Sequence, residues 1–511
     1  MGGGISKMLH NYYSIYSSEY LHKGLVLYNS MKKYDREFRF YVICFDDTSK
    51  ELLDKMNLEN LISIRIKDIE AYDSEMASVR PCREDKTYTW LVKPVAALYL
   101  FDIYPDLDHL LWLDGDMEFK SDPQSIYDEW GDYSVLLTIE GFTDEYFKYS
   151  LLYGYYNTGL LGFKRDSNAF ECLKYYREKL IVCNFDDYIG SWNDQLYVTD
   201  WPQRFNNIGV VKNPGINLTP FITFYRNYHD KGWLINKRGD GYYLHDSKIT
   251  LYHYMAVKYI NADEFDLCRY VMDFNEEQIK HMYLAYLKSC RNVMEQIKLI
   301  DEGQYYSRNT KGRFIRNYFN LSINETKPKF NLCTVVNSDS LDKCLELYKS
   351  LLNICLDFQL WICCMDERSY DYMDSKQLNN VILIDVKNLE DPEDEDLISA
   401  KNTMDEIEYI CIIKPLLIHY IMKNNYNING ILYISNDYDI SSSLFGMYMN
   451  SEESIIILPN ASQNGGVEYG KYNSDLMWFK RDKAAFEYLK NWREKCKLWC
   501  SEKKEGNGRG N

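Results

Sequence analysis

The sequence lacks the features that mark several classes of protein. Its 14 cysteines include no Cys-x-x-Cys pair, so neither a disulfide framework nor a zinc site is indicated, and we expect reduced, buried thiols. It has no run of about 18 apolar residues that could span a bilayer, and it does not begin with a basic stretch followed by an apolar one, as a signal peptide does. We therefore expect a soluble, cytoplasmic protein with no transmembrane segment, for which peripheral contact with a membrane stays open.

Basic residues are also scarce. The 511 residues include 59 Lys and Arg against 76 Asp and Glu, a formal charge of −17. Proteins held on nucleic acid need basic surfaces, so no nucleic-acid partner is expected. The hydrophobic content of 46% is that of a globular protein. A chain of this length exceeds what one hydrophobic core usually supports, so several domains are expected.

Tyrosine, by contrast, is abundant, with 47 residues against 11 prolines. Clefts rich in tyrosine often bind sugars and nucleobases, because the ring stacks on a flat face while the hydroxyl forms a hydrogen bond. A general bias in composition explains the same abundance, so both interpretations stay open.

The two halves of the chain repeat one another block by block. Residues 20–30 match residues 340–350, and the apolar run 41–46 matches 361–366 at the same offset. The other matching blocks follow in the same order: 62–67 with 382–387, 93–94 with 414–415, 111–116 with 432–437, and 157–166 with 473–482. This order indicates a tandem duplication. Because only about 30 residues follow its last block, against about 90 further residues in the first copy, we expect the second copy to be incomplete.

Each copy alternates short apolar runs with helical periods. The runs are rich in β-branched and aromatic residues, as in buried parallel strands. Apolar residues between them recur at helical spacing, as at Leu21, Leu25 and Tyr28. This alternation predicts an α/β fold with mostly parallel sheets flanked by helices. The expected divisions are a domain over 10–262, a helical linker over 263–328, a second, incomplete domain over 329–500 and a disordered tail over 501–511.

The strongest local signal for chemistry is the segment His109–Glu118. An apolar run there ends in Asp114 and Asp116, which are separated by one glycine. Ligands bind at the carboxyl ends of strands in open α/β sheets. Two carboxylates at that place are hard oxygen ligands for Mn²⁺ or Mg²⁺, and such an ion keeps positions free for substrate phosphates.

With four further motifs, the first copy resembles the GT-A nucleotide-diphospho-sugar transferases, especially the group similar to glycosyltransferase family 8. These motifs are Trp90-Leu-Val-Lys-Pro94, Asn157-Thr-Gly-Leu-Leu-Gly-Phe163, Trp192-Asn-Asp-Gln-Leu196 and Asn213-Pro-Gly-Ile-Asn217. The resemblance spans residues 13 to about 260 in the order that the family shows. It implies two tandem Rossmann-like GT-A domains.

The implied activity is that of a metal-dependent hexosyl- or pentosyltransferase. Such an enzyme moves a sugar from a nucleoside-diphosphate-sugar, here expected to be a UDP-sugar, to a hydroxyl acceptor. The acceptor would be a glycan, or a lipid-linked or protein acceptor, as in polysaccharide biosynthesis.

The resemblance also implies which residues form the site. Asp114 and Asp116 would hold Mn²⁺ or Mg²⁺ with a later histidine. The expected ligand is His253, at the end of a short apolar strand, and His245 is its competitor. Asp114 would also lie near the donor ribose.

Further residues would contact the two substrates. Asn157 would face the donor or acceptor sugar, and Asp194 and Gln195 would lie near the anomeric carbon. The donor side would be formed by Ser14, Tyr16 and Tyr20, in the first loop that holds the base, and by Lys93. The alternative roles are ordinary turn or cap positions for Asn157, Asp194 and Gln195, and a helix start at Lys93-Pro94.

The stereochemistry is expected to be retention, with the leaving phosphate helping to deprotonate the acceptor hydroxyl. An inverting enzyme would need a carboxylate base instead. Glu140, Asp144 and Glu145 keep that alternative open.

The second copy departs from the pattern. The aspartate triplet becomes Ser435-Asn436-Asp437, although a shifted pair, Asp437 and Asp439, remains, and the Asn-Thr-Gly block becomes Asn473-Ser474-Asp475. The Asp-Gln and histidine elements have no counterpart, so we expect a degenerate domain.

The sequence has a feature against each of three alternative functions. A phosphatase of the haloacid dehalogenase type would want Thr or Val where Glu118 stands. A nucleotidyltransferase would want a glycine-rich, Arg-containing loop where residues 14–18 lie. A non-catalytic carbohydrate-binding or scaffold protein built from decayed domains would have lost the metal site in the first copy as well.

Overall fold

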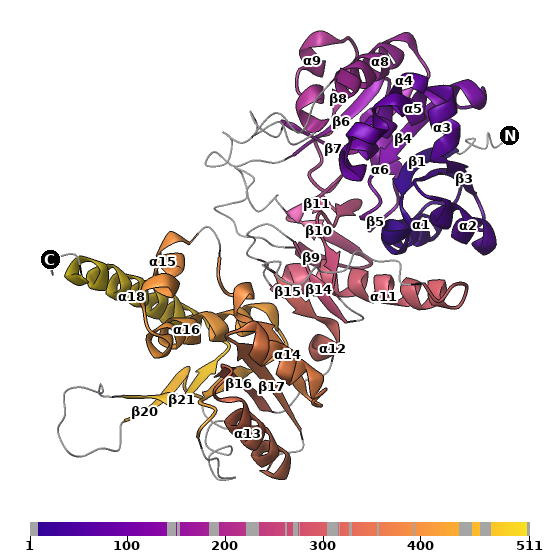
Figure 1. Ribbon diagram of the computed structural model, residues 1–511. Coiled ribbons are helices and arrows are strands. Elements are labelled where there is room, and N and C mark those ends of the chain that lie inside the picture. Colours follow the sequence, from indigo (N-terminus) through magenta and orange to yellow (C-terminus); the bar gives the residue numbers. More distant parts are fainter. Residues whose placement is uncertain are drawn as a thin grey trace. The chain divides into compact units, whose positions relative to one another are not determined.

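The computed structural model describes residues 9–140, 150, 154–182, 194–220, 235–260, 263–268, 274, 276–303, 315, 317–325, 330–354, 357–391, 394–438, 452–459 and 472–507. The chain forms two compact units, the first from residues 1–262 and 270–308 and the second from residues 263–269 and 309–511. Each unit is built on one large sheet flanked by helices (Figure 1).

The sheet of the first unit has the strand order β3-β2-β1-β4-β7-β6-β8. Its first four strands are parallel, β7 runs antiparallel to both β4 and β6, and β8 is parallel to β6. The order of the first four strands is that of a Rossmann-like half. The strands are β1 (His10–Tyr16), β2 (Phe38–Cys44), β3 (Leu61–Arg65), β4 (His109–Leu113), β6 (Val135–Ile139), β7 (Tyr156–Lys164) and β8 (Ile208–Val210).

Helices cover both faces of this sheet, because successive side chains of a strand point to opposite faces. Tyr13 of β1 joins the core formed with α5 and α8, while Tyr12 packs on the other face against Phe38 and Phe119. The helices are α1 (Leu21–Tyr34), α2 (Asp47–Met56), α3 (Ile66–Tyr72), α4 (Ser74–Val79), α5 (Asp85–Ile103), α6 (Gln124–Trp130), α8 (Ser167–Val182) and α9 (Trp201–Arg204), with 3-10 turns η1 (Ser18–Tyr20), η2 (Arg80–Cys82) and η4 (Asp194–Val198).

Smaller strands lie beyond the end of β4. β5 (Met117–Phe119) pairs antiparallel with β12 (Leu251–His253), and this pairing places His253 opposite Met117. The other elements are an antiparallel sheet of β9 (Ile235–Arg238), β10 (Gly241–Leu244) and β11 (Ser247–Lys248), the strand β13 (Lys258–Tyr259), and the helical run α10 (Glu276–Gln278), η7 (Ile279–Tyr283) and α11 (Leu284–Lys298).

The sheet of the second unit repeats the first six strands of the first unit's large sheet, and no described strand corresponds to β8. Its order is β18-β17-β16-β19-β21-β20, with β18 to β19 parallel and β21 antiparallel. The register is also repeated, since His10 lies opposite Phe38 and Phe330 lies opposite Phe358. The strands are β16 (Phe330–Val336), β17 (Phe358–Cys364), β18 (Val381–Asp385), β19 (Gly430–Ile434), β20 (Ile455–Pro459) and β21 (Tyr472–Lys480).

The helices of the second unit follow its strands in the same order along the chain as in the first unit. They are α13 (Leu341–Ile354), α14 (Glu367–Ser375), the 3-10 turn η8 (Val386–Asn388), α15 (Glu395–Thr403), α16 (Glu406–Asn424) and α18 (Lys483–Asn507), preceded by β14 (Glu264–Asp266), β15 (Tyr318–Asn320) and α12 (Leu321–Glu325). Even a helix cap recurs: Asp46 accepts the backbone N–H of Ser49, and Asp366 accepts that of Ser369.

The predicted fold class is confirmed: the protein is an α/β protein with two mixed, mostly parallel sheets flanked by helices. The predicted linker 263–328 is shared between the units, since α11 belongs to the first and β14, β15 and α12 to the second. The domain limits therefore stay a prediction. The expectation of a disordered tail is wrong for residues 501–507, because α18 continues to Asn507 through a stretch of Glu and Lys, which are good helix formers.

Two expectations from composition can be compared with the structure. Eleven cysteines have side chains that the structure describes; all eleven are free and nine are buried, as expected for reduced thiols. Within the part of the chain that the structure describes, no helix is both long and apolar enough to cross a membrane.

Candidate active site

Asp114 and Asp116 lie where strand β4 ends. The backbone N–H of Asp114 donates to the carbonyl of Gly159 on β7 (2.9 Å), and the carbonyl of Asp116 accepts the N–H of Tyr254 (2.8 Å). The glycine between the two aspartates lies close to a buried ring, since a Cβ there would come within 2.7 Å of Tyr16. The turn is therefore held from three sides, which fixes the two carboxylates relative to the sheet.

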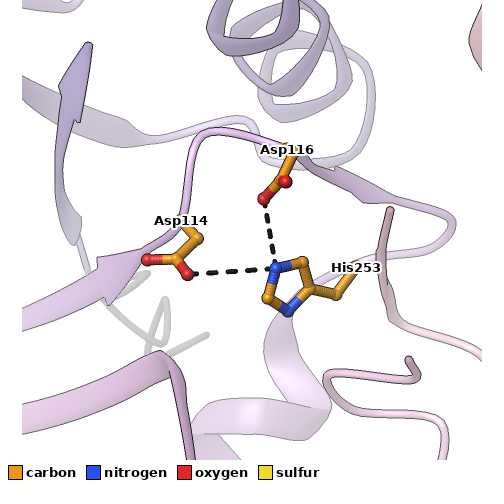
Figure 2. A group of neighbouring side chains, drawn as sticks. All are labelled: Asp114, Asp116 and His253. Atoms are coloured by element: carbon orange, nitrogen blue, oxygen red, sulfur yellow. Dashed lines mark hydrogen bonds and ion pairs between the residues drawn. The ribbon is translucent and has the colours of Figure 1, made fainter. Parts of the chain in front are cut away.

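His253 completes a group with these aspartates. Its backbone N–H donates to the carbonyl of Leu218 (2.9 Å). Its Nε2 atom lies 3.1 Å from Asp116 Oδ1 and 3.9 Å from Asp114 Oδ2 (Figure 2). Ligand atoms of all three residues lie within 4.8 Å of one another. His253 and Asp116 are buried, whereas the side chain of Asp114 is 30% exposed.

The group fits a divalent ion. Two carboxylates and one imidazole are a ligand set that suits Mn²⁺ or Mg²⁺, and the exposed side of Asp114 leaves room for further ligands. His245 takes no part in this group; it lies between β10 and β11 with a left-handed φ of 54°. Of the two candidate histidines, the structure thus brings His253 to the aspartates.

The charges of His253 and its neighbouring aspartates shift one another's pKa values. Burial alone would lower the pKa of His253, but the charges of Asp116 and Asp114 outweigh it and raise that pKa. Burial would raise the pKa of Asp116, but His253 outweighs it and holds that pKa below its usual value. The imidazole and the carboxylate therefore stabilise one another's charged forms.

Lys93 lies between two carboxylates inside the unit. Its Nζ atom is 3.0 Å from Asp194 Oδ2 and 3.5 Å from Asp114 Oδ1, and it donates to the carbonyl of Thr158 (3.2 Å). Burial would lower the pKa of Lys93, but Asp114 and Asp194 outweigh it and raise the pKa. The side chain of Lys93 is only 5% exposed, so its ammonium group faces Asp114 and Asp194 rather than solvent. The helix-start alternative is wrong, because Pro94 lies inside α5.

The two oxygens of Asp114 have different surroundings. Oδ1 accepts the indole N–H of Trp112 (2.8 Å) and faces Lys93, whereas Oδ2 is turned toward His253. Protein groups thus fix one oxygen and leave the other for the open side of the site.

Asp194 is nearly inaccessible, with a side chain that is 1% exposed. It accepts hydrogen bonds from the hydroxyls of Thr158 (2.9 Å) and Tyr176 (2.7 Å) in addition to its ion pair with Lys93. Asp194 is therefore linked to Asp114 through Lys93 and serves as a counter-charge within the interior; its expected position near the anomeric carbon stays a prediction.

Asn157, Gln195 and Glu140 form a second buried polar cluster. Asn157 donates to Glu140 through Nδ2 and accepts the backbone N–H of Gly159 (2.8 Å) through Oδ1. Burial raises the pKa of Glu140 to about 7, and hydrogen bonds from Asn157 and Gln195 offset part of this shift. A carboxyl group with this pKa exchanges its proton near neutral pH.

The three residues expected to hold a nucleotide base lie in different surroundings. Ser14 is fully buried and donates to the carbonyl of Leu113 (2.6 Å). The buried ring of Tyr16 packs so tightly against Gly24 that a Cβ there would come within 2.4 Å of it. The expectation that Ser14 and Tyr16 contact a nucleotide base is therefore corrected. Both side chains lie on β1 and are enclosed by neighbouring residues of the core. Tyr20 is 40% exposed and remains available to a ligand.

Asp144, Glu145, Trp192 and Asp439 lie outside the described residues. The sequence did not single out Trp112, Tyr176 or Asn217 for a role at the site. The only signals were a strand tryptophan two residues before Asp114, a tyrosine at a helical core position, and the last residue of the Asn213–Asn217 motif.

The corresponding position in the second unit has a different set of groups. Lys414 donates to Ser474 as Lys93 does to Thr158, but its acidic partner is Asp475, at 3.6 Å and half exposed. Ser435 donates to Asp437 (2.7 Å) where the first unit has its aspartate pair. Within the described parts of both units, only Asp114, Asp116 and His253 form a group able to hold a metal ion.

Comparisons with known proteins give distant relatives. No family model matches the chain. Two uncharacterized proteins of Bacillus subtilis (strain 168) are similar: YfnD, 24% identical over 288 residues (56% of this chain, 90% of that protein), and YfnF, 22% identical over 299 residues (57% and 94%).

Solved structures similar to the chain include glycosyltransferases. One is the galactosyltransferase LgtC in complex with donor and acceptor sugar analogues, at 16% identity, covering 55% of this chain and 95% of that one with a TM-score of 0.34. Another is the apo form of the glycosyltransferase GlyE in Streptococcus pneumoniae TIGR4, at 10% identity, covering 87% and 90% with a TM-score of 0.34. At such scores the likeness carries no argument about activity, which must come from the site.

Proposed function

We propose that the first unit is a glycosyltransferase that depends on a divalent ion, Mn²⁺ or Mg²⁺. It would move a sugar from a nucleoside-diphosphate-sugar, expected to be a UDP-sugar, to a hydroxyl of a glycan, lipid-linked or protein acceptor. The observation that carries this proposal is the convergence of Asp114, Asp116 and His253 at the carboxyl end of β4, with one side open. The sequence motifs around these residues support it.

The reaction needs charge stabilisation more than an acid or base. A diphosphate leaves carrying negative charge, and a divalent ion bound at the site would neutralise that charge. Asp114, Asp116 and His253 would hold the ion. Lys93 balances the charge of Asp114 from inside the unit, and Trp112 fixes the orientation of that carboxylate.

Retention is the proposed stereochemistry. An inverting enzyme needs a carboxylate that can reach the acceptor hydroxyl. Glu140, the described candidate for that role, is 5% exposed and is already hydrogen-bonded to Asn157 and Gln195. These bonds favour a role for Glu140 in holding the amides of Asn157 and Gln195 in place.

The second unit is proposed to be a degenerate copy without transferase activity. Its strand order and register repeat those of the first unit, which supports a tandem duplication. Ser435 replaces the first aspartate, and Asp475 replaces the glycine beside the histidine. A wholly non-catalytic scaffold is less consistent with the first unit, where the three ligand side chains remain together.

A donor screen tests the proposal. The full chain is incubated with Mn²⁺ and a panel of UDP-, GDP- and dTDP-sugars, and release of the nucleoside diphosphate is measured. One donor should be hydrolysed slowly. Asp116→Asn should abolish this activity, while the matched change Asp437→Asn in the second unit should retain it. No hydrolysis and no Mn²⁺-dependent nucleotide binding across the panel would overturn the proposal.

A further inference from the structure

We infer that Asn157 and Asn217 are positioning residues that hold His253 in the tautomer whose Nε2 lone pair faces Asp114 and Asp116. The inference rests on the proposed function, because it gives these two amides a task only if an ion is bound there. Three successive hydrogen bonds lead to it, each of which fixes the orientation of the next group.

The first bond fixes the amide of Asn157. A backbone N–H can only donate, and that of Gly159 lies 2.8 Å from one amide atom of Asn157, which must therefore be the oxygen. The nitrogen then faces the carboxylate of Glu140, which accepts its hydrogen. In the second unit the N–H of Asp475 donates in the same way to Asn473 (2.7 Å). This bond is thus a property of the fold, since it persists in a unit whose described residues form no metal-binding group.

The second bond fixes the amide of Asn217. Because the Asn157 oxygen is an acceptor, the Asn217 atom 2.9 Å away must be the nitrogen, which also donates to the hydroxyl of Thr138 (2.7 Å). The oxygen of Asn217 is thereby turned toward His253. The backbone at Asn217 has a left-handed φ of 59°, a conformation that asparagine adopts more readily than most residues.

The third bond fixes the histidine. The Asn217 oxygen lies 3.2 Å from His253 Nδ1 and can only accept, so Nδ1 carries a proton. A histidine that binds an ion through Nε2 must be neutral, and with the proton on Nδ1 the lone pair is then on Nε2, the atom that faces Asp116 and Asp114. Gly159 also limits the ring, since a Cβ there would come within 2.5 Å of His253 Cε1.

Two substitutions of Asn217 separate this role from a merely structural one. Asn217→Ala removes the acceptor for Nδ1–H. Loss of such an outer partner of a metal ligand typically costs about 10–100-fold in metal affinity, which is the loss expected here. Asn217→Asp keeps an acceptor for Nδ1–H but places a second oxygen against Asn157. A structural role therefore predicts that Asp is at least as harmful as Ala, whereas the positioning role predicts that Asp restores most of the affinity.

The control is Asn207→Ala. Asn207 also has a left-handed φ, of 60°, and its amide donates to Asp132 and Ser134, outside the hydrogen-bonded chain that leads to His253. The measurement is Mn²⁺ binding to the full chain, followed by the electron paramagnetic resonance of the free ion. The control should bind Mn²⁺ as the unmodified chain does.

A second measurement needs no variant that disturbs the fold. Nitrogen-15 resonances of histidine-labelled protein saturated with Mg²⁺ report which ring nitrogen carries the proton, and His253→Gln assigns the signal. A proton on Nδ1 of His253 is expected. A proton on Nε2, or an Asn217→Ala variant that binds Mn²⁺ as tightly as the unmodified chain, would overturn the inference and leave the proposed function standing. Failure of the unmodified chain to bind Mn²⁺ would overturn both.

Discussion

Lys93→Met tests whether the buried ammonium group holds the carboxylates of the site in place. Methionine keeps most of the apolar stem but removes the charge that lies 3.0 Å from Asp194 and 3.5 Å from Asp114. Asp194, with a side chain that is 1% exposed, would then remain as a buried carboxylate without its cation. We expect the first unit to lose stability.

The magnitude follows from the surroundings of Asp194. Removing one partner of a buried ion pair typically costs about 3–5 kcal/mol. The hydroxyls of Thr158 and Tyr176 would still donate to Asp194, which favours the lower end of that range. The first unit comprises residues 1–262 and 270–308. For about 300 residues at about 2.1 cal/mol/K per residue, each kcal/mol corresponds to roughly 1.6 °C, so a loss of about 3 kcal/mol lowers the melting temperature of the first unit by about 5 °C.

The duplication supplies a matched control. Lys414 occupies the equivalent position in α16, but its partner Asp475 is at 3.6 Å and half exposed. Water can replace the lost cation there, so Lys414→Met should cost about 1 kcal/mol or less. Differential scanning calorimetry of the full chain measures both changes.

Equal shifts for the two variants, or a fall of less than about 2 °C for Lys93→Met, would refute this reasoning. Adding Asp194→Asn to Lys93→Met should recover part of the lost stability, because no unpaired charge is then left in the interior. A double variant no more stable than Lys93→Met alone would also contradict it.

Two further substitutions have definite expected outcomes. Folding raises the pKa of Glu140 from 4.5 to about 7, so between these pH values the folded state holds a proton that the unfolded state has lost. The protonated Glu140 therefore contributes its full stabilisation below pH 4.5, and this contribution is lost as the pH rises through 7. Glu140→Gln should remove a pH dependence on the order of 3 kcal/mol, measured by urea unfolding at pH 5 and pH 8, and an unchanged dependence would contradict the assignment. Gly159→Ala should lower Mn²⁺ affinity at least about tenfold by displacing His253, while far-ultraviolet circular dichroism stays unchanged, since Asp475 shows that this strand position accepts a side chain.

The sheets could be predicted from sequence because their signals are local and occur twice. Apolar runs give the strands, helical periods separate them, and the repeated blocks require both halves to adopt one topology. The aspartate pair is equally local, since a strand that ends in Asp-Gly-Asp places both carboxylates at one edge of the sheet. His253 could not be found from a local pattern. It reaches the aspartates through the pairing of β12 with β5, and only the family resemblance pointed to it.

The remaining errors and omissions share a physical cause. Ser14 and Tyr16 are two residues apart on β1. Only the folded structure shows that Ser14 is bonded to Leu113 and that Tyr16 packs against Gly24, so that both are enclosed. The chain of hydrogen bonds through Asn157 joins segments far apart in the sequence. No sequence pattern shows which way an amide is turned, whereas one backbone N–H in the folded structure decides it.

The second unit separates what the fold requires from what the site requires. A lysine on a helix donates to a strand hydroxyl in both units: Lys93 to Thr158 and Lys414 to Ser474. In both units a strand asparagine, Asn157 or Asn473, also accepts the backbone N–H two residues further along the chain. These features persist where Ser435 has replaced the first aspartate, so they belong to the fold. In the second unit Lys414 has an acidic neighbour, Asp475. This residue occupies the position that corresponds to Gly159, where the first unit has room for the ring of His253. The charge of the lysine is therefore balanced in both units, whereas of the two equivalent strand positions Gly159 leaves space for a metal-binding histidine and Asp475 fills it with a side chain.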